Sequence, residues 1–416
     1  MNPFLIQPDK SENARKDNWN NICVKPCVKE ETAPYTRVRM ILMNGTEFET
    51  VQFLHRFSRM CTNNELRREL SLLRRNAQIR QKRLAALKPE NENLLEHTIG
   101  YEQLAVDLTA ILAKREKNTY VKKQFDFALL EDFDHLYRYA DLMELEKQGD
   151  PAKLVGDYTE IMPGRPTIAE QRHPYDDVKF YINHYLSDLN TRLNVNIITA
   201  AEQQTMNYYM NVGNFYATPL GRRMFTEIAM IEEQHVTGYG GLKDPSATWL
   251  ENLVMNAYTS CFLYESCRND ETDERIAEIY TRHLSDCIAD LAKCALLLEK
   301  YEGKVWQQLF PEGGDLPELI AFRSQKDYVR NVLKTVRLTA VEEGFEELAL
   351  VPDDFRYFAY NKRIAGNPDS VATHIAVRET IRTYGKDYRL EDKPHPVTEL
   401  ASRTEDNISV GREKSA

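Results

Sequence analysis

Apolar side chains recur at spacings of three and four residues along most of this chain, which is the period of an amphipathic α-helix. The clearest stripe lies within about Asp273 to Tyr301 and comprises Ile276, Ile279, Leu284, Cys287, Ile288, Leu291, Cys294 and Leu298. Similar patterns, bounded by capping residues and prolines, predict further helices at about 62–87, 90–116, 120–147, 196–217, 219–238, 247–267 and 324–348. The pattern therefore predicts an all-α fold.

Segments containing proline and glycine interrupt this pattern and indicate where the chain divides. The longest runs from Gly149 to about Leu193, and a loop of that length inside a compact domain needs a reason. The N-terminal segment 1–60 mixes proline, asparagine and charge, which predicts an extended arm with an optional hairpin across Asn44-Gly45. Three parts are therefore expected: the arm at 1–60, a helical bundle with flanking helices at 61–305, and a helical extension with an irregular tail at 306–416.

Composition and charge narrow the class of protein. The formal net charge of −10 makes nucleic acid or an anionic membrane surface an unfavourable partner. No apolar run is long enough to predict a transmembrane helix, and the first residues lack the basic region of a secretory signal. The seven scattered cysteines are typical of reduced thiols. These observations predict a soluble, cytoplasmic protein.

An internal match appears when the chain is compared with itself at an offset of 100 positions. It pairs carboxylates and histidines, namely Glu102 with Glu202, Asp132 with Glu232, and His135 with His235. Each half therefore has a lone carboxylate followed, at the same distance along the chain, by an acid-x-x-His unit. Residues at i and i+3 lie on one helix face, so the acid and the histidine of each unit can point at one centre.

Turn signals lie halfway between the matched residues of each half. Asn118-Thr119 follows the midpoint of the first half, and Thr218-Pro219 follows the midpoint of the second. Each arm is then about 15 residues long, or roughly 22 Å at 1.5 Å per residue. Two antiparallel hairpins would therefore bring the lone carboxylate of each half level with its acid-x-x-His unit.

These six residues resemble the ligand set of the ferritin-like di-iron carboxylate superfamily, which includes ferritins, rubrerythrins and several oxygenases. The resemblance covers about residues 90–240, and the long break fits the long crossover that joins the two hairpins in that family. It implies a four-helix bundle that holds two metal ions, with iron expected and manganese or a mixed Mn/Fe pair as alternatives. The implied metal ligands are Glu102, Asp132, His135, Glu202, Glu232 and His235.

The first half departs from the family pattern, because Asp132 stands where Glu is usual and a shorter acid leaves a gap to the metal. The neighbouring Glu131 is an alternative ligand, and Glu227, Glu233 and Glu265 are possible additional ones. A solvated acidic face is the plain alternative for Asp132 and Glu131. Glu265 lies in an otherwise apolar helix, so it is expected to have a cation partner or a metal unless it is exposed.

Other residue types near these positions leave alternatives open. Several tyrosines lie close to the proposed ligands, either as proton or electron relays or as core packing: Tyr101, Tyr139, Tyr208, Tyr209 and Tyr239. The crossover segment Arg172–Tyr185 either hydrogen-bonds to the ligands or merely packs. His283, at position i−4 from Cys287, is a weaker metal candidate for which packing is favoured.

Three classes of function follow from the resemblance. Iron held by carboxylates and only two histidines keeps open positions for O2 or peroxide, so an oxidoreductase acting on an unknown small-molecule substrate is favoured. A metal-storage protein and a metal-free interaction protein are the alternatives. Cys23 and Cys27 form a C-x3-C pair rather than the C-x2-C of a rubredoxin-type iron site, so an external electron donor is expected. A homodimer stays open, and no catalytic residue beyond the ligands is identified.

Overall fold

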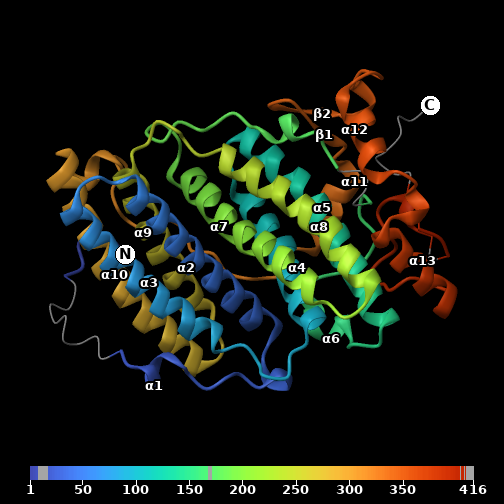
Figure 1. Cartoon of the computed structure of the whole chain (residues 1–416), viewed down its shortest axis with the longest axis horizontal. Helices are drawn as coiled ribbons and strands as arrows, with labels where there is room; N and C mark the ends of the chain where they lie inside the picture. Colours follow the sequence, from blue (N-terminus) through green and yellow to red (C-terminus); the bar gives the residue numbers. More distant parts are fainter. Residues whose placement is uncertain (8–16, 167–170, 403, 407, 409–416) are drawn as a thin grey trace. The chain divides into compact units, whose positions relative to one another are not determined.

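The computed structural model describes residues 1–7, 17–166, 171–402, 404–406 and 408. Over these residues the chain is mainly helical, and its one sheet has two strands (Figure 1). The prediction of a mainly helical chain is therefore confirmed. None of the helices in the described ranges combines the length and the apolar composition that crossing a bilayer would require.

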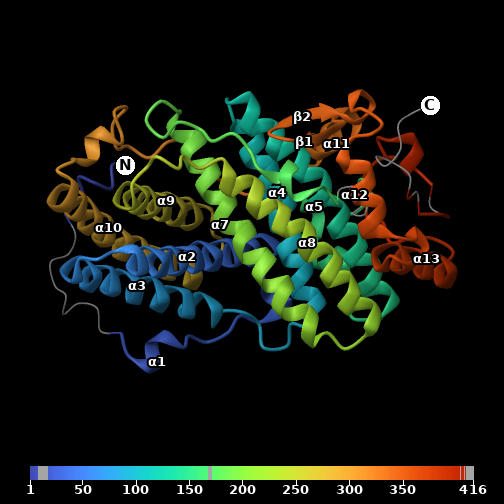
Figure 2. The same ribbon diagram turned by 45° about the horizontal axis from the view of Figure 1, so that its top comes forward.

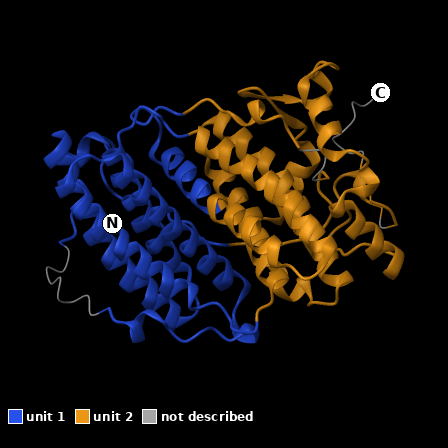
Figure 3. Cartoon of the chain, in the orientation of Figure 1, with its two compact units in different colours: residues 1–91, 182–201, 243–322 blue, residues 92–181, 202–242, 323–416 orange. Residues whose placement is uncertain are grey.

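The chain divides into two compact units, which Figure 3 colours separately. Unit 1 comprises residues 1–91, 182–201 and 243–322, and unit 2 comprises residues 92–181, 202–242 and 323–416. Helix α7 (Leu189–Val212) begins in the first unit and ends in the second. Both units are assembled from separated segments, so they do not coincide with the three consecutive parts expected from the sequence.

Four long helices form the body of unit 1 (Figures 1 and 2): α2 (Pro34–Met60), α3 (Asn64–Ala85), α9 (Trp249–Asp270) and α10 (Glu274–Glu302). Helix α2 packs against α3 and α9, and α10 packs against α9 and α3. The short helix α1 (Trp19–Ile22) precedes them. Two hairpins from distant parts of the chain, α2–α3 and α9–α10, thus supply this bundle.

Helix α2 corrects the prediction of an extended arm with a hairpin at Asn44-Gly45. Residues 34–60 are one continuous helix that begins with Pro34 in its first turn, where proline is tolerated. The helix was hard to recognise because it is buried on several faces, including the polar side chains of Arg39 and Glu47. With buried polar residues all round, the contrast between an apolar and a polar face is lost.

The body of unit 2 consists of α4 (Leu94–Arg115), α5 (Thr119–Leu145), the end of α7 and α8 (Pro219–Gly241). Helix α5 packs against both α4 and α8. Asn118 caps α5 and Thr218 caps α8, each through a side-chain oxygen that accepts backbone N–H bonds. Both predicted turns between the matched residues are therefore confirmed.

The crossover between α5 and α7 contains only short helical pieces within the described residues, such as α6 (Pro151–Val155), so the predicted long break is confirmed. The helix predicted at 324–348 is present only in its first half. Helix α11 (Lys326–Thr335) ends early, and β1 (Leu338–Val341) pairs antiparallel with β2 (Gly344–Glu347). Glu342 adopts a φ of +51° in the intervening turn, which a helix cannot accommodate.

Two further helices complete unit 2, namely α12 (Arg356–Ala365) and α13 (Ala372–Tyr384). Helix α13 packs against both α5 and α8. This helix belongs to the C-terminal part of the chain, where the sequence predicted a helical extension. Residues 409–416, predicted as part of an irregular tail, lie outside the described residues.

Candidate metal centre

All six predicted ligands meet in the core of unit 2. Each of the four helices contributes to the cluster: Glu102 from α4, Asp132 and His135 from α5, Glu202 from α7, and Glu232 and His235 from α8. Every one of these side chains is at most 1% exposed. The sequence match at an offset of 100 positions therefore corresponds to proximity in the folded chain.

Their ligand atoms form two groups, in each of which the atoms lie within 4.8 Å of one another. Site A is defined here as Glu102, His135 and Glu232, and site B as Asp132, Glu202, Glu232 and His235. Glu232 belongs to both groups. A carboxylate has two oxygens, so one residue can bind a cation on each side.

The distances around Glu232 agree with such a bridging position. Its Oε1 lies 2.9 Å from Nδ1 of His135, and its Oε2 lies 3.3 Å from Nδ1 of His235. In site A, Oε2 of Glu102 lies 4.0 Å from the same His135 nitrogen. In site B, Oδ1 of Asp132 lies 3.3 Å from Nδ1 of His235. Asp132, although shorter than the usual glutamate, therefore reaches its group.

Five atoms that face these groups have no hydrogen-bond partner among the described residues: Glu102 Oε2, Asp132 Oδ1, Glu202 Oε2, Glu232 Oε2 and His235 Nδ1. Burying a polar atom without a partner is costly, so such atoms are rare unless something binds them. Four of the five are carboxylate oxygens that converge in a buried core. The cluster therefore fits a pair of divalent cations, whose four positive charges its four carboxylates would balance.

The electrostatics of the cluster point the same way. Burial, followed by repulsion from Glu232, raises the pKa of Glu102 well above its ordinary value. Burial also raises the pKa of Asp132 to about 7 and that of Glu202 well above the usual range. Without cations these carboxyls therefore hold their protons to a higher pH than exposed acids do. Bound metal would displace those protons, since metal ligands have to be ionised.

Glu131, the alternative ligand, belongs to neither group. Its Oε2 lies 2.5 Å from Nε2 of His235, and its Oε1 accepts a hydrogen bond from Arg172. Burial opposes ionisation, but Arg172 and His235 outweigh it and lower the pKa of Glu131. An ionised carboxylate on Nε2 fixes the ring so that Nδ1 faces site B. Histidines that bind metals are commonly oriented in this way.

Arg172 connects the crossover segment to His235, because it bonds to Glu131. Its guanidinium also binds Asp177, with Nε 2.9 Å from Oδ1, and its backbone carbonyl accepts a bond from the amide of Gln234. Of the two options for residues 172–185, hydrogen bonding toward the ligands is therefore observed at Arg172. The sequence predicts a role only for residues 172–185 as a segment, and not for Arg172 itself.

The other proposed additional ligands have different partners. Both carboxylate oxygens of Glu227 accept backbone N–H bonds from Ala372 and Thr373, at the start of α13. Glu265 belongs to unit 1 and pairs with Arg268 at 2.8 Å, which is the cation partner that its position required. Neither residue is a member of site A or site B.

Three tyrosines surround the cluster. Tyr209 donates a hydrogen bond to Oε1 of Glu102, the oxygen that does not face the other ligands. The hydroxyls of Tyr139 and Tyr239 are buried and have no partner among the described residues. Burial, reinforced by the nearby carboxylates, raises the pKa of both residues. Both phenols therefore stay protonated and can donate to a molecule bound beside them.

Comparisons with protein-family models, with curated proteins and with solved structures found no match for this chain. The resemblance to di-metal proteins therefore rests on the six side chains, on their spacing and on the two groups they form. The arrangement can hold two cations that share Glu232, keep bulk water away from them and present protonated phenols nearby.

Proposed function

We propose that this chain is a ferritin-like di-metal carboxylate oxidoreductase that activates O2 or reduces peroxide. The observation that carries the proposal is Glu232, which is shared by two ligand groups and faces a histidine with each oxygen. The four helices that contribute ligands, together with the long crossover, support assignment to the ferritin-like type.

The donor set supports iron, with manganese or a mixed pair as the alternatives. Carboxylate oxygen and imidazole nitrogen suit these metals, and neither group contains a thiolate. When bound, such a metal pair supplies Lewis acidity and electron transfer toward O2 or peroxide. Site A has three protein ligands and site B has four, which leaves coordination positions for a small molecule.

The roles of the surrounding residues follow from their contacts. Glu131 and Arg172 hold His235 in one orientation. Tyr139 and Tyr239 keep protons that a reduced oxygen species would need. Complete burial of the ligands excludes bulk water, which limits unproductive loss of reactive species.

A cavity in unit 2 supports an enzyme rather than a storage protein. It has a volume of about 350 Å³ and is bordered by residues of α8, including Thr226 and Met230, and by Tyr360 of α12. That volume lies at the small end of the range for ligand pockets. Gln171 also lines it and precedes Arg172, so the cavity adjoins the contacts that orient His235. We propose that an organic substrate binds there.

The proposal includes an external electron donor and a reducing, cytoplasmic location. All seven cysteines are free thiols, and none belongs to site A or site B. The chain therefore offers no cysteine-held cluster at the centre to supply electrons. Free thiols also agree with a reducing compartment.

The test is an oxidation assay on protein loaded anaerobically with ferrous iron, given a chemical reductant and then O2 or hydrogen peroxide. The parent and a Glu233→Gln control should consume the oxidant with repeated turnover, whereas Glu232→Gln should not. Glu233 is a suitable control because it adjoins Glu232 but bonds to Thr237 instead. Metal uptake without turnover would indicate storage, and absence of uptake would indicate a metal-free helical protein.

A further inference from the structure

The bundle of unit 1 repeats the bundle of unit 2 at a fixed offset along the chain. The turns before α3 and α5 differ by 55 in residue number, and so do the turns before α8 and α10. The helix caps repeat as well. Asn63 and Asn118 each accept from the second and third residues that follow, and Thr218 and Asp273 each accept from the third. The two bundles therefore have the same chain order and turn positions.

The same tyrosine–glutamate hydrogen bond is present in both bundles. Tyr209 donates to Oε1 of Glu102 in unit 2, and Tyr264 donates to Oε1 of Glu47 at 2.8 Å in unit 1. Both members of the pair are displaced by this same offset, one backward and one forward along the chain. A coincidence of residue type, position and bonded atom indicates equivalent geometry in the two cores.

The aromatic neighbour of each tyrosine repeats at the same offset. The ring centroids of Tyr209 and Phe225 are 5.6 Å apart, and those of Tyr264 and Tyr280 are 6.2 Å apart. Positions 225 and 280 are again related by this offset. The equivalence therefore extends from α9 to α10 as it does from α7 to α8.

The polar contact that orients His235 also has a counterpart. In unit 2, Glu131 binds Nε2 of His235 at 2.5 Å. In unit 1, Nδ2 of Asn76 binds Oδ1 of Asp290 at 2.9 Å. Both residues of the pair are displaced by the same offset as before. This contact joins the two hairpins of each bundle across the core, so the hairpins pack in the same register.

The equivalence identifies what stands at the metal-ligand positions in unit 1. In the order of the ligands from Glu102 to His235, the equivalent residues are Glu47, Ala77, Arg80, Ala257, Cys287 and Asp290. Glu47 alone keeps its residue type. Two acids have become alanine and one has become cysteine, and the two histidines have become an arginine and an aspartate.

Arg80 supplies a cation in the core of unit 1. Its Nε lies 2.6 Å from Oε1 of Glu47, and its Nη1 lies 2.8 Å from Oδ2 of Asp290. Arg80 is 3% exposed and Glu47 is fully buried. Because a guanidinium remains charged at any ordinary pH, Arg80 supplies one permanent positive charge to this pair of buried acidic side chains.

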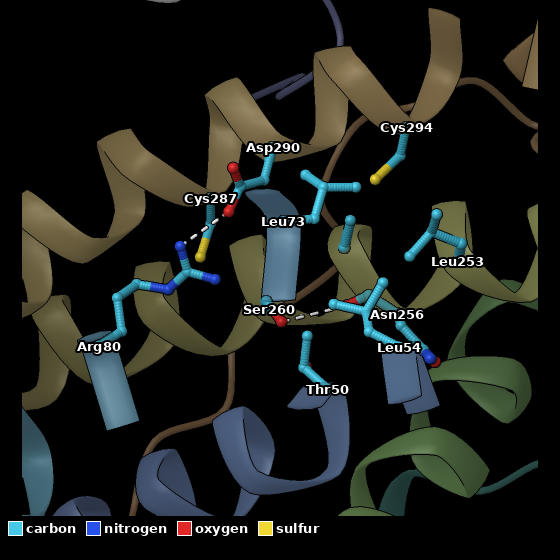
Figure 4. Close-up of a pocket in the computed structure, with 11 residues that line it drawn as sticks. Thr50, Leu54, Leu73, Arg80, Leu253, Asn256, Ser260, Cys287, Asp290 and Cys294 are labelled. Atoms are coloured by element: carbon cyan, nitrogen blue, oxygen red, sulfur yellow. Dashed lines mark hydrogen bonds and ion pairs between the residues drawn. The ribbon is translucent and has the colours of Figure 1, made fainter. Parts of the chain in front are cut away.

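A cavity of about 20 Å³ lies beside this ion cluster, and four of the six equivalent positions line it: Arg80, Ala257, Cys287 and Asp290. Figure 4 shows the guanidinium of Arg80, on α3, reaching Asp290 on α10 at the edge of this space. The volume is enough for about one water molecule. The side chains at these positions therefore leave a void that Arg80 does not fill completely.

We propose that unit 1 is a second copy of the metal-binding bundle, in which the Arg80 guanidinium takes the place of the metal ions. The chain then has one di-metal centre, and the core of unit 1 is closed to metal because it carries its own cation. Naming the unit 2 cluster as a metal centre rests on the proposed function. The repeated contacts and the role of Arg80 as a resident cation do not.

The first part of the test compares metal content at equivalent positions of the two copies. A Glu232→Ala, His235→Ala variant should lose its metal, whereas Cys287→Ala, Asp290→Asn should keep the parent's content of about two ions per chain. A parent that holds about four ions, or a halved content in the unit 1 variant, would overturn the proposal.

The second part needs no metal, so it separates failure of this proposal from failure of the proposed function. Arg80→Met should lower the thermal midpoint by roughly 10 °C, because Glu47 and Asp290 lose their cation. The Glu47→Gln, Arg80→Met, Asp290→Asn variant should recover most of that loss, since the unpaired charges are gone. Failure of this rescue would show that Arg80 does not act by charge and would reject it as a replacement cation. A metal-free parent with the expected rescue would instead reject only the proposed function.

Discussion

Oε1 of Glu232 lies 2.9 Å from Nδ1 of His135, although the two residues come from different helices and are 97 positions apart in the chain. The other oxygen of the same carboxylate faces His235 at 3.3 Å. Burial opposes the ionisation of Glu232, but the hydrogen bond with His135 and the charge of the nearby His235 outweigh it and hold its pKa below the usual range. An ionised Glu232 thus belongs to both site A and site B, where its two oxygens can bind a cation on each side.

Removing the bridge should affect both metals, whereas removing a ligand of one site should affect one. Glu232→Gln is predicted to lose most of both ions, and Glu202→Gln to lose mainly the ion of site B. Metal content after gel filtration measures the difference, with Glu233→Gln as the matched control. Equal losses in the Glu232 and Glu202 variants would argue against a bridging carboxylate.

Glu131→Gln should weaken metal binding without removing a ligand. The neutral amide holds the ring of His235 in place less firmly. It also lacks the negative charge that makes the other ring nitrogen a stronger metal ligand. Outer contacts of this kind are typically worth about 10- to 100-fold in metal affinity. Competition with a chelator measures that affinity, and Glu144→Gln near the end of the same helix is the control. A metal affinity equal to that of the control would show that Glu131 does not support metal binding through His235.

Arg172→Met should destabilise the fold. The substitution leaves Glu131 and Asp177 buried without their shared cation, and removing one partner of such a group costs about 3–5 kcal/mol. Denaturant titration gives the free energy of unfolding. Adding Glu131→Gln and Asp177→Asn should restore much of it, whereas a loss below about 1 kcal/mol in the single variant would show that Arg172 is not needed for charge balance.

The stability contributed by Asp406 should depend on pH. Burial alone raises its pKa, but Arg138 and His374 outweigh burial and hold the pKa at about 2, below the ordinary 3.8. The folded state then binds fewer protons than the unfolded state, so this contribution is complete above about pH 4 and is lost as the pH falls toward 2. Asp406→Asn is predicted to cost about 2 kcal/mol at pH 7.

The difference in unfolding free energy between the parent and Asp406→Asn should therefore shrink toward zero between about pH 4 and pH 2. Arg138 also binds Asp134, so the guanidinium keeps one acidic partner in the variant. Denaturant titrations at several pH values test this prediction. A constant difference over that range would mean that Asp406 acts through shape rather than charge.

The ligand cluster could be found in the sequence because its signals are local. Asp132 and His135 stand at i and i+3 on one helix, and the turns of both hairpins carry their own capping residues. Antiparallel pairing of the helices in each hairpin then predicts that Glu102 and Glu202 lie level with the acid-x-x-His units. Helices α4, α5 and α8 begin and end within a few residues of the predicted positions for the same reason.

Other features depend on contacts that leave no local pattern. Arg172 reaches Glu131 from a crossover without regular periodicity, so nothing in its neighbours marks it as the partner. Helix α2 was obscured because buried charges such as Arg39 and Glu47 imitate exposed positions. The repeat of the bundle in unit 1 was equally hidden, since of the six ligand positions only Glu47 keeps its residue type.

The presence of a metal pair in unit 2 is tested by the metal content of the purified parent beside a Glu232→Ala, His235→Ala variant, each measured before and after anaerobic loading with ferrous iron. We expect about two ions of iron or manganese per chain in the parent and a large loss in the variant. A parent that stays free of metal after loading would contradict this expectation, and the converging carboxylates of unit 2 would then belong to a purely structural core.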